Sequence, residues 1–118
     1  MVACNYAKAM PSPWGKVDYI FKIAPGVMWV GTPSHGGLLV GKKVARDKLS
    51  AKAIECAFPG AWAQYIAFEE DCAYALALYE CPAWDAGLSF TAFPPRDPAE
   101  RHEELRQIIE RWMPEYFN

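Results

Sequence analysis

The sequence predicts an α+β fold, in which a small antiparallel meander sheet of three or more strands is followed by helices packed on one face of that sheet. Between Lys16 and Lys43, short alternating or apolar segments are separated by proline and glycine, which is typical of strands and tight turns. Helical periodicity with capping residues appears only later in the chain. Strands first and helices after is an order that α+β domains adopt.

The length and composition of the chain fit one domain. Its 118 residues, 53% of them hydrophobic, suffice to bury a single core. We expect that domain over residues 16–118, after a loosely ordered arm over residues 1–15 from which Trp14 packs back onto the core. No apolar run approaches the roughly 20 residues of a membrane span, and residues 1–8 lack the pattern of a signal peptide. We therefore expect a cytoplasmic protein with no membrane partner.

The first three elements are expected to be strands. Residues 16–23 alternate, so that one face of a half-buried strand holds the side chains of Val17, Tyr19, Phe21 and Ile23. Pro25 and Gly26 suit the two corners of the turn that follows. Residues 27–31 and 38–43 supply the next two strands, on either side of the hexapeptide Thr32-Pro33-Ser34-His35-Gly36-Gly37.

The middle of the chain predicts shorter elements. Residues 42–52 form a basic, mostly polar connector. Ser50 is suited to cap a short helix over residues 51–58, which the following proline and glycine would end. Residues 61–67 are apolar and fit either a strand or a helix.

Two longer helices are expected in the second half, with a short strand over residues 87–93 between them. The first covers residues 69–80, and its first turn holds the carboxylates of Glu69, Glu70 and Asp71, which a helix dipole stabilises. The second covers residues 97–113, with Asp97 as the N-cap and proline in the first turn. Its apolar stripe consists of Leu105, Ile108, Ile109 and Trp112.

Charge is distributed unevenly along the sequence. Residues 1–60 contain eight basic and three acidic side chains, a net charge of +5, whereas residues 61–118 contain four basic and eleven acidic ones, a net charge of −7. Such asymmetry suggests charged partners, although folding can also interleave the two halves into a mixed surface. The whole chain carries a charge of only −2, which argues against direct nucleic-acid binding.

The four cysteines are expected to be free thiols. Their spacing matches neither a CxxC pair nor a zinc knuckle, and cytosolic thiols stay reduced. Cys72 and Cys81 lie among apolar residues and are expected to act as small buried hydrophobic side chains.

The hexapeptide loop is the first candidate for chemistry. His35 can act as a general acid or base near neutral pH, and Ser34 beside it suggests a nucleophile that His35 would activate. A carboxylate from Glu69, Glu70 or Asp71 could orient His35. The alternative is that His35 stabilises the loop by hydrogen bonds, and no hydrolase motif surrounds the pair.

No cofactor or metal is expected from the sequence. The phosphate-binding patterns GxxxxGK[ST] and GxGxxG are absent. A metal site would need His35, His102 and a carboxylate to converge from three distant segments, and we expect none.

Two segments resemble a domain family of unknown function. They are Trp29-Val30-Gly31-Thr32-Pro33-Ser34-His35-Gly36-Gly37 and the later Phe68-Glu69-Glu70-Asp71-Cys72. The family occurs in proteins of proteobacterial plasmids, prophages and integrative elements, so the resemblance implies an origin in a mobile element and no catalytic activity.

We therefore favour a protein that acts by binding over an enzyme, with the small enzyme that uses His35 and Ser34 as the alternative. Proteins of this size in mobile elements often block host defence, as anti-CRISPR proteins do. The expected partner is a host protein or nucleoprotein complex with a basic surface. The expected binding residues are the carboxylates of Glu69, Glu70, Asp71, Glu100, Glu103 and Glu104.

Overall fold

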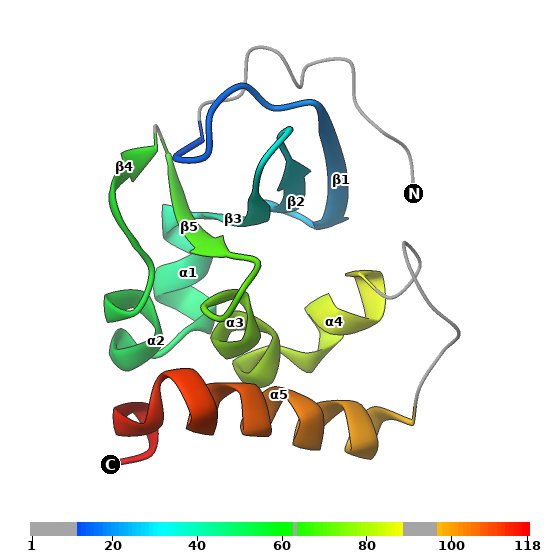
Figure 1. Ribbon diagram of the computed structural model, residues 1–118, viewed down its shortest axis with the longest axis vertical. Helices are drawn as coiled ribbons and strands as arrows, with labels where there is room; N and C mark the ends of the chain where they lie inside the picture. Colours follow the sequence, from blue (N-terminus) through cyan, green and yellow to red (C-terminus); the bar gives the residue numbers. More distant parts are fainter. Residues whose placement is uncertain (1–11, 63, 89–96) are drawn as a thin grey trace.

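The computed structural model describes residues 12–62, 64–88 and 97–118, and it has the α+β architecture that the sequence predicts (Figure 1). Five strands form one antiparallel sheet in the order β1-β2-β3-β5-β4. Their bounds are β1 Tyr19–Ala24, β2 Val27–Gly31, β3 Gly36–Gly41, β4 Phe58–Trp62 and β5 Tyr65–Glu69. The first three strands are the expected meander.

The helices gather on one side of this sheet, and α3 lies between the sheet and α5 (Figure 1). Their bounds are α1 Lys42–Lys48, α2 Ala51–Glu55, α3 Tyr74–Glu80, α4 Pro82–Leu88, α5 Pro98–Trp112 and the 3₁₀ helix η3 Pro114–Phe117. No helix among the described residues is long and apolar enough to cross a membrane.

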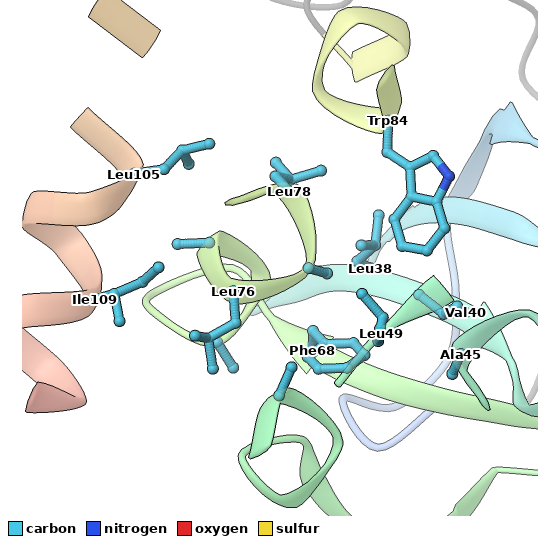
Figure 2. Close-up of a cluster of buried hydrophobic side chains, with 14 of the residues drawn as sticks. Leu38, Val40, Ala45, Leu49, Phe68, Leu76, Leu78, Trp84, Leu105 and Ile109 are labelled. Atoms are coloured by element: carbon cyan, nitrogen blue, oxygen red, sulfur yellow. The ribbon is translucent and has the colours of Figure 1, made fainter. Parts of the chain in front are cut away.

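The sheet has apolar side chains on both of its faces. On the helix side, Leu38 and Phe68 pack against Leu76 and Leu78 of α3, and Leu105 and Ile109 of α5 cover the far side of α3 (Figure 2). On the other face, a smaller cluster forms under Trp14, which packs there as expected; its buried members are Val17, Ile20, Val30, Leu39 and Ala67. Most of the preceding arm, residues 1–11, lies outside the described residues.

The predicted alternation of the first strand is confirmed for Tyr19 and Phe21, whose ring centroids are 5.0 Å apart on one face, but Val17 does not share that face and a residue of the opposite face is also buried. Ile20 is buried together with Val17, whereas Tyr19 is 37% exposed. Val17 precedes β1 and does not continue its alternation, and the pairing with β2 shifts between Lys22 and Ala24. Val17 and Ile20, which share the buried face, are three residues apart, so the period of two is already broken before β1 begins, and the register shift lies beyond both residues.

The turn after β1 is confirmed. Gly26 has φ +75°, a left-handed conformation that glycine adopts without the strain that a Cβ would cause. The second strand, β2, has the predicted bounds of residues 27–31. The third, β3, begins two residues earlier than predicted, because Gly36 and Gly37 also pair with β2.

Several expectations for the middle of the chain need correction. The segment expected to be a polar connector, residues 42–52, begins with the helix α1. Ala45 and Leu49 are four residues apart, so both lie on the side of this helix that packs into the core. Ser50 caps α2 as predicted, and its Oγ accepts from the N–H of Ala53 at 3.1 Å, but the helix ends at Glu55. The next residues form β4 instead, since they pair with β5.

The helix expected from residue 69 starts at Tyr74, because Glu69 still belongs to β5. Its acidic residues therefore precede the helix, and the dipole explanation is wrong. The strand expected over residues 87–93 is wrong for its first two residues, because Gly87 and Leu88 are the last residues of α4. The remaining residues, 89–93, lie outside the described residues.

The C-terminal helix is confirmed. Asp97 Oδ2 accepts from the N–H of Glu100 at 3.2 Å, and Pro98 is the first helical residue. Leu105 and Ile109 are buried, but Trp112 is 59% exposed, which corrects the predicted stripe. The contact with α3 covers the side of α5 centred on the two buried residues, and Trp112 lies at the flank of that side, in the last turn.

We predict that Gly37→Ala destabilises the protein by at least about 2 kcal/mol, measured by chemical denaturation. A Cβ on Gly37 would lie 2.6 Å from Trp14 Cη2 and 3.0 Å from Glu69 Cα, and closer still to the main-chain oxygen of Phe68. Gly41→Ala is the matched control on the same strand, since its Cβ would meet nothing nearer than 3.5 Å. Equal effects of the two substitutions would contradict the close-packing explanation.

Candidate functional site

The structure brings together the two sequence segments that carry the family resemblance. Gly37 of β3 pairs with Glu69 of β5, and the N–H of Glu70 donates to the Gly36 oxygen at 3.0 Å. The loop Thr32–His35 and the turn that contains Glu70 and Asp71 therefore adjoin at one end of the sheet. This juxtaposition is what a site built from His35 and an acidic residue would require.

The loop is closed by its own first and last residues. Thr32 Oγ1 donates to the His35 oxygen at 2.6 Å and accepts from the His35 N–H at 3.0 Å, while the Thr32 N–H donates to the same oxygen at 2.8 Å. Pro33, Ser34 and His35 are exposed on the outside of this turn. Its geometry thus depends on the Thr32 hydroxyl and on the backbone.

The side chains of Ser34 and His35, which are both among the described residues, are not hydrogen-bonded to each other in this arrangement. Within the part of the chain that the structure describes, neither makes a hydrogen bond or an ion pair, to the other or to an acid. The expected hydrogen bond from the imidazole to the loop is likewise not observed. His35 contributes to the loop through its main-chain atoms.

The carboxylate of Glu69 is engaged elsewhere. Its Oε1 accepts a hydrogen bond from Cys72 Sγ at 3.1 Å, three residues along the same turn. Burial, this hydrogen bond and the negative charge of Glu69 together raise the pKa of the Cys72 thiol to about 11. Cys72 is therefore an unreactive thiol at neutral pH, and Glu70 and Asp71 remain as exposed carboxylates.

The two histidines lie on different layers of the fold. His35 ends the loop between β2 and β3, whereas His102 belongs to α5, which lies beyond α3 from the sheet (Figure 1). The ring of His102 stacks on Tyr79, with centroids 4.2 Å apart and planes 12° from parallel. Among the described residues, no three histidine, cysteine or acidic side chains are close enough to hold a metal ion together.

The acidic residues of α5 are partly engaged in ion pairs along the helix. Arg106 forms ion pairs with Glu103, at 2.6 Å, and with Glu110, and the contact with Arg106 lowers the pKa of Glu103. Glu104 lies 3.4 Å from Arg101. Glu100 is exposed, and its carboxylate has no ion pair within the described residues.

Arg101 itself is held mainly by a residue of another helix. Its Nε donates to both carboxylate oxygens of Asp85, at 3.1 and 3.0 Å, and thereby ties α5 to α4. The positive charge of Arg101 is thus largely neutralised by the carboxylates of Asp85 and Glu104. The solvent side of α5 consequently presents more negative than positive charge.

Sequence reasoning missed an exposed aromatic residue at the end of that same helix. The rim of a shallow groove along α5 contains Trp112, with Arg111 stacked over its ring at 5.4 Å. The other lining residues are Glu104, Gln107 and Ile108. A tryptophan at helical spacing from buried residues indicates a core position, so only the tertiary contacts could show its exposure.

A second feature that the sequence did not reveal is a polar cluster around Glu80. Its carboxylate accepts from the N–H of Ser50 at 2.7 Å, from Ser50 Oγ at 2.6 Å and from the Tyr116 hydroxyl. Burial and the contact with Glu80 raise the pKa of Tyr116. Lys52 Nζ donates to the main-chain oxygens of Tyr116 and Asn118, at 3.3 and 2.8 Å.

The hydroxyls of Ser50 and Tyr116 are paired with the Glu80 carboxylate, and the Lys52 ammonium is paired with main-chain oxygens. Ser50 also caps α2, and Tyr116 follows α5, so the cluster joins α2, α3 and η3. The raised pKa of the Tyr116 hydroxyl keeps it un-ionised at neutral pH, so it does not supply a phenolate nucleophile or base there. We interpret the cluster as structural.

Comparison with known proteins places the chain in a family. A model of the DUF7007 family, described as a domain of unknown function, matches residues 7–118. No curated protein sequence and no solved structure shows a significant match. The resemblance to a domain family of unknown function is confirmed, and its origin in mobile elements stays a prediction.

We predict that Thr32→Val lowers the free energy of unfolding by about 1 kcal/mol, because both hydrogen bonds of its hydroxyl are lost. His35→Ala should change it by less than about 0.5 kcal/mol, since the imidazole is exposed. Chemical denaturation of both variants measures the difference. A larger loss for His35→Ala than for Thr32→Val would contradict the role assigned to the threonine.

We also predict that Cys72 reacts with iodoacetamide at pH 8 about a hundredfold more slowly than an exposed thiol, because so little of it is ionised. Glu69→Gln removes the negative charge that raises its pKa, and should increase this rate at least about threefold. Peptide-resolved mass spectrometry follows each cysteine separately, with Cys81 as the internal control. A rate for Cys72 that Glu69→Gln leaves unchanged would exclude the proposed coupling.

Proposed function

The chain belongs to the DUF7007 family, and we propose that it acts by binding, as a small accessory protein that occupies a basic surface on a protein or nucleoprotein complex. The contact surface in this proposal is the solvent side of α5. The observation that carries it is the combination, on one helix, of exposed carboxylates with a 59% exposed tryptophan.

The charge of α5 supports a basic partner. Residues 97–112 contain five carboxylates and three arginines, and one of those arginines is turned toward Asp85. Glu100, Glu103 and Glu104, the binding residues expected from the sequence, all lie in the N-terminal half of the helix. Complementary charge accelerates association and selects the partner, and it does so more strongly at low ionic strength.

The apolar part of the same surface supports an anchored contact. Trp112 and Ile108 line the groove beside the carboxylates, and tryptophan is among the residues that most often dominate binding energy at interfaces. Because Trp112 is mostly exposed, its contribution to folding is small. A partner with a basic surface and an apolar hollow would match both halves of α5.

The acidic turn at Glu70 and Asp71 is the second contact in this proposal. These carboxylates are exposed at the end of the sheet, on the segment that leads into α3. They lie on a different element from α5, so we assign them a supporting role.

The class of partner rests on the resemblance to proteins of mobile elements. Such elements carry small proteins that inhibit host defence by binding, so we propose a defence nucleoprotein complex as the target, with an anti-CRISPR-like mode of inhibition. An acidic surface can occupy a channel of arginines and lysines that otherwise holds nucleic acid.

We predict that charge reversal of Glu100, Glu103 and Glu104 to lysine leaves the protein folded, since exposed ion pairs contribute less than about 1 kcal/mol each. The same reversals should slow association with the target at least about tenfold at 50 mM salt, and less at high salt. Trp112→Ala should instead accelerate dissociation. Surface plasmon resonance against a panel of purified CRISPR effector and restriction complexes measures both rates.

The matched control reverses three exposed acids that lie outside both α5 and α1, namely Asp18, Glu55 and Glu115, which changes the net charge of the protein by the same amount. Association should be affected far less by this control. If no complex in the panel binds, the partner class is wrong. Equal effects of the two triple variants would show that net charge matters and that α5 does not.

A further inference from the structure

The helix that the sequence did not predict, α1, is firmly attached to the sheet. Ala45 and Leu49 are buried in the main core, and the N–H of Lys42 donates to the Gln64 oxygen at 2.7 Å. The remaining charged residues of the helix are all exposed; they are Lys42, Lys43, Arg46, Asp47 and Lys48. A short helix with one buried side thus presents four cationic side chains and one carboxylate to solvent.

These cations are unpaired within the described residues. The side chains of Lys42, Lys43, Arg46 and Lys48 make no ion pair or hydrogen bond there, although Asp47 lies on the same helix. The contrast with α5 is clear, because Arg101 and Arg106 each contact two carboxylates. The positive charge of α1 is therefore available to another molecule.

Folding does not account for the position of two of these charges. Lys42 and Lys43 lie in the first turn of α1, which contains no acidic residue. Positive charge near the N-terminus of a helix opposes the helix dipole and does not stabilise it. Replacing these lysines should therefore not cost stability, and their presence is explained better by binding.

The composition of this surface indicates the kind of partner. Each exposed residue of α1 is charged, and none is an aromatic or aliphatic side chain of the kind that anchors a folded protein. Surfaces rich in lysine and arginine bind polyanions, since each contact with the phosphate backbone releases counterions, and on α1 four cations outweigh the single carboxylate of Asp47. Lysine and arginine are also the side chains that most readily contact phosphate oxygens.

We propose that the exposed side of α1 binds the phosphate backbone of a nucleic-acid duplex without sequence preference. The inference is independent of α5 and extends the proposed function to a second surface of opposite charge. The charge of −2 for the whole chain argued against such binding at the level of sequence. The structure changes that argument, because it concentrates four cations on α1 and places the acidic α5 elsewhere on the molecule (Figure 1).

The test measures binding of the full chain to a fluorescently labelled 20-base-pair DNA duplex by anisotropy, between 50 and 200 mM salt. With three to four phosphate contacts, the logarithm of the binding constant should fall with the logarithm of the salt concentration with a slope of about −3. The double variant Lys42→Gln/Lys43→Gln should bind at least tenfold more weakly at 50 mM salt and should unfold at the same temperature as the wild type.

The matched control is Lys16→Gln/Lys22→Gln, which removes two exposed lysines outside α1 and so changes the net charge equally. Binding by this variant should stay within about twofold of the wild type. The proposal is overturned if the wild-type protein does not bind the duplex at 50 mM salt, or if the two double variants lose affinity equally. It is also overturned if polyglutamate of equal charge displaces the duplex at equal concentration, since an acidic protein segment would then be the preferred partner.

Discussion

Strand β3 pairs with β2 on one side and with β5 on the other, and apolar side chains cover both of its faces. Its position requires that the backbone of Phe68 and Glu69 approach Gly37 more closely than any side chain would permit. The helices depend on this pairing, because α3 follows β5 after the turn over residues 70–73 and α5 packs on α3. The glycine pair Gly36-Gly37 is thus explained by the close approach of neighbouring strands at the centre of the sheet.

This explanation also bears on the chemistry of the site. The loop Thr32–His35 is exposed on the outside of the turn, and its polar contacts are internal to its own four residues. Glu69, whose backbone pairs with Gly37, accepts a hydrogen bond from Cys72. Within the described residues its carboxylate makes no hydrogen bond to the imidazole of His35. The pairing of β3 with β5 thus accounts for the proximity of the two motifs.

The charge asymmetry of the sequence persists in the folded protein. The acidic half of the sequence contributes α5, where neighbouring carboxylates partly neutralise the arginines. The basic half contributes α1, whose lysine and arginine side chains form no ion pair within the described residues. Exposed charges contribute little to folding, so both surfaces can change without loss of the fold. A protein with two such surfaces is suited to a partner that itself combines basic protein with nucleic acid.

The sequence by itself determined the features that depend on neighbours along the chain. These are the α+β order, the turn at Gly26, the second strand, and the caps Ser50 and Asp97, because turns and caps are formed by contacts a few residues apart. Only the tertiary structure decided which faces are buried and which charges are paired. The pairing of β5 with β3, the exposure of Trp112 and the free cations of α1 depend on segments distant in sequence, and local periodicity contains no information about such contacts.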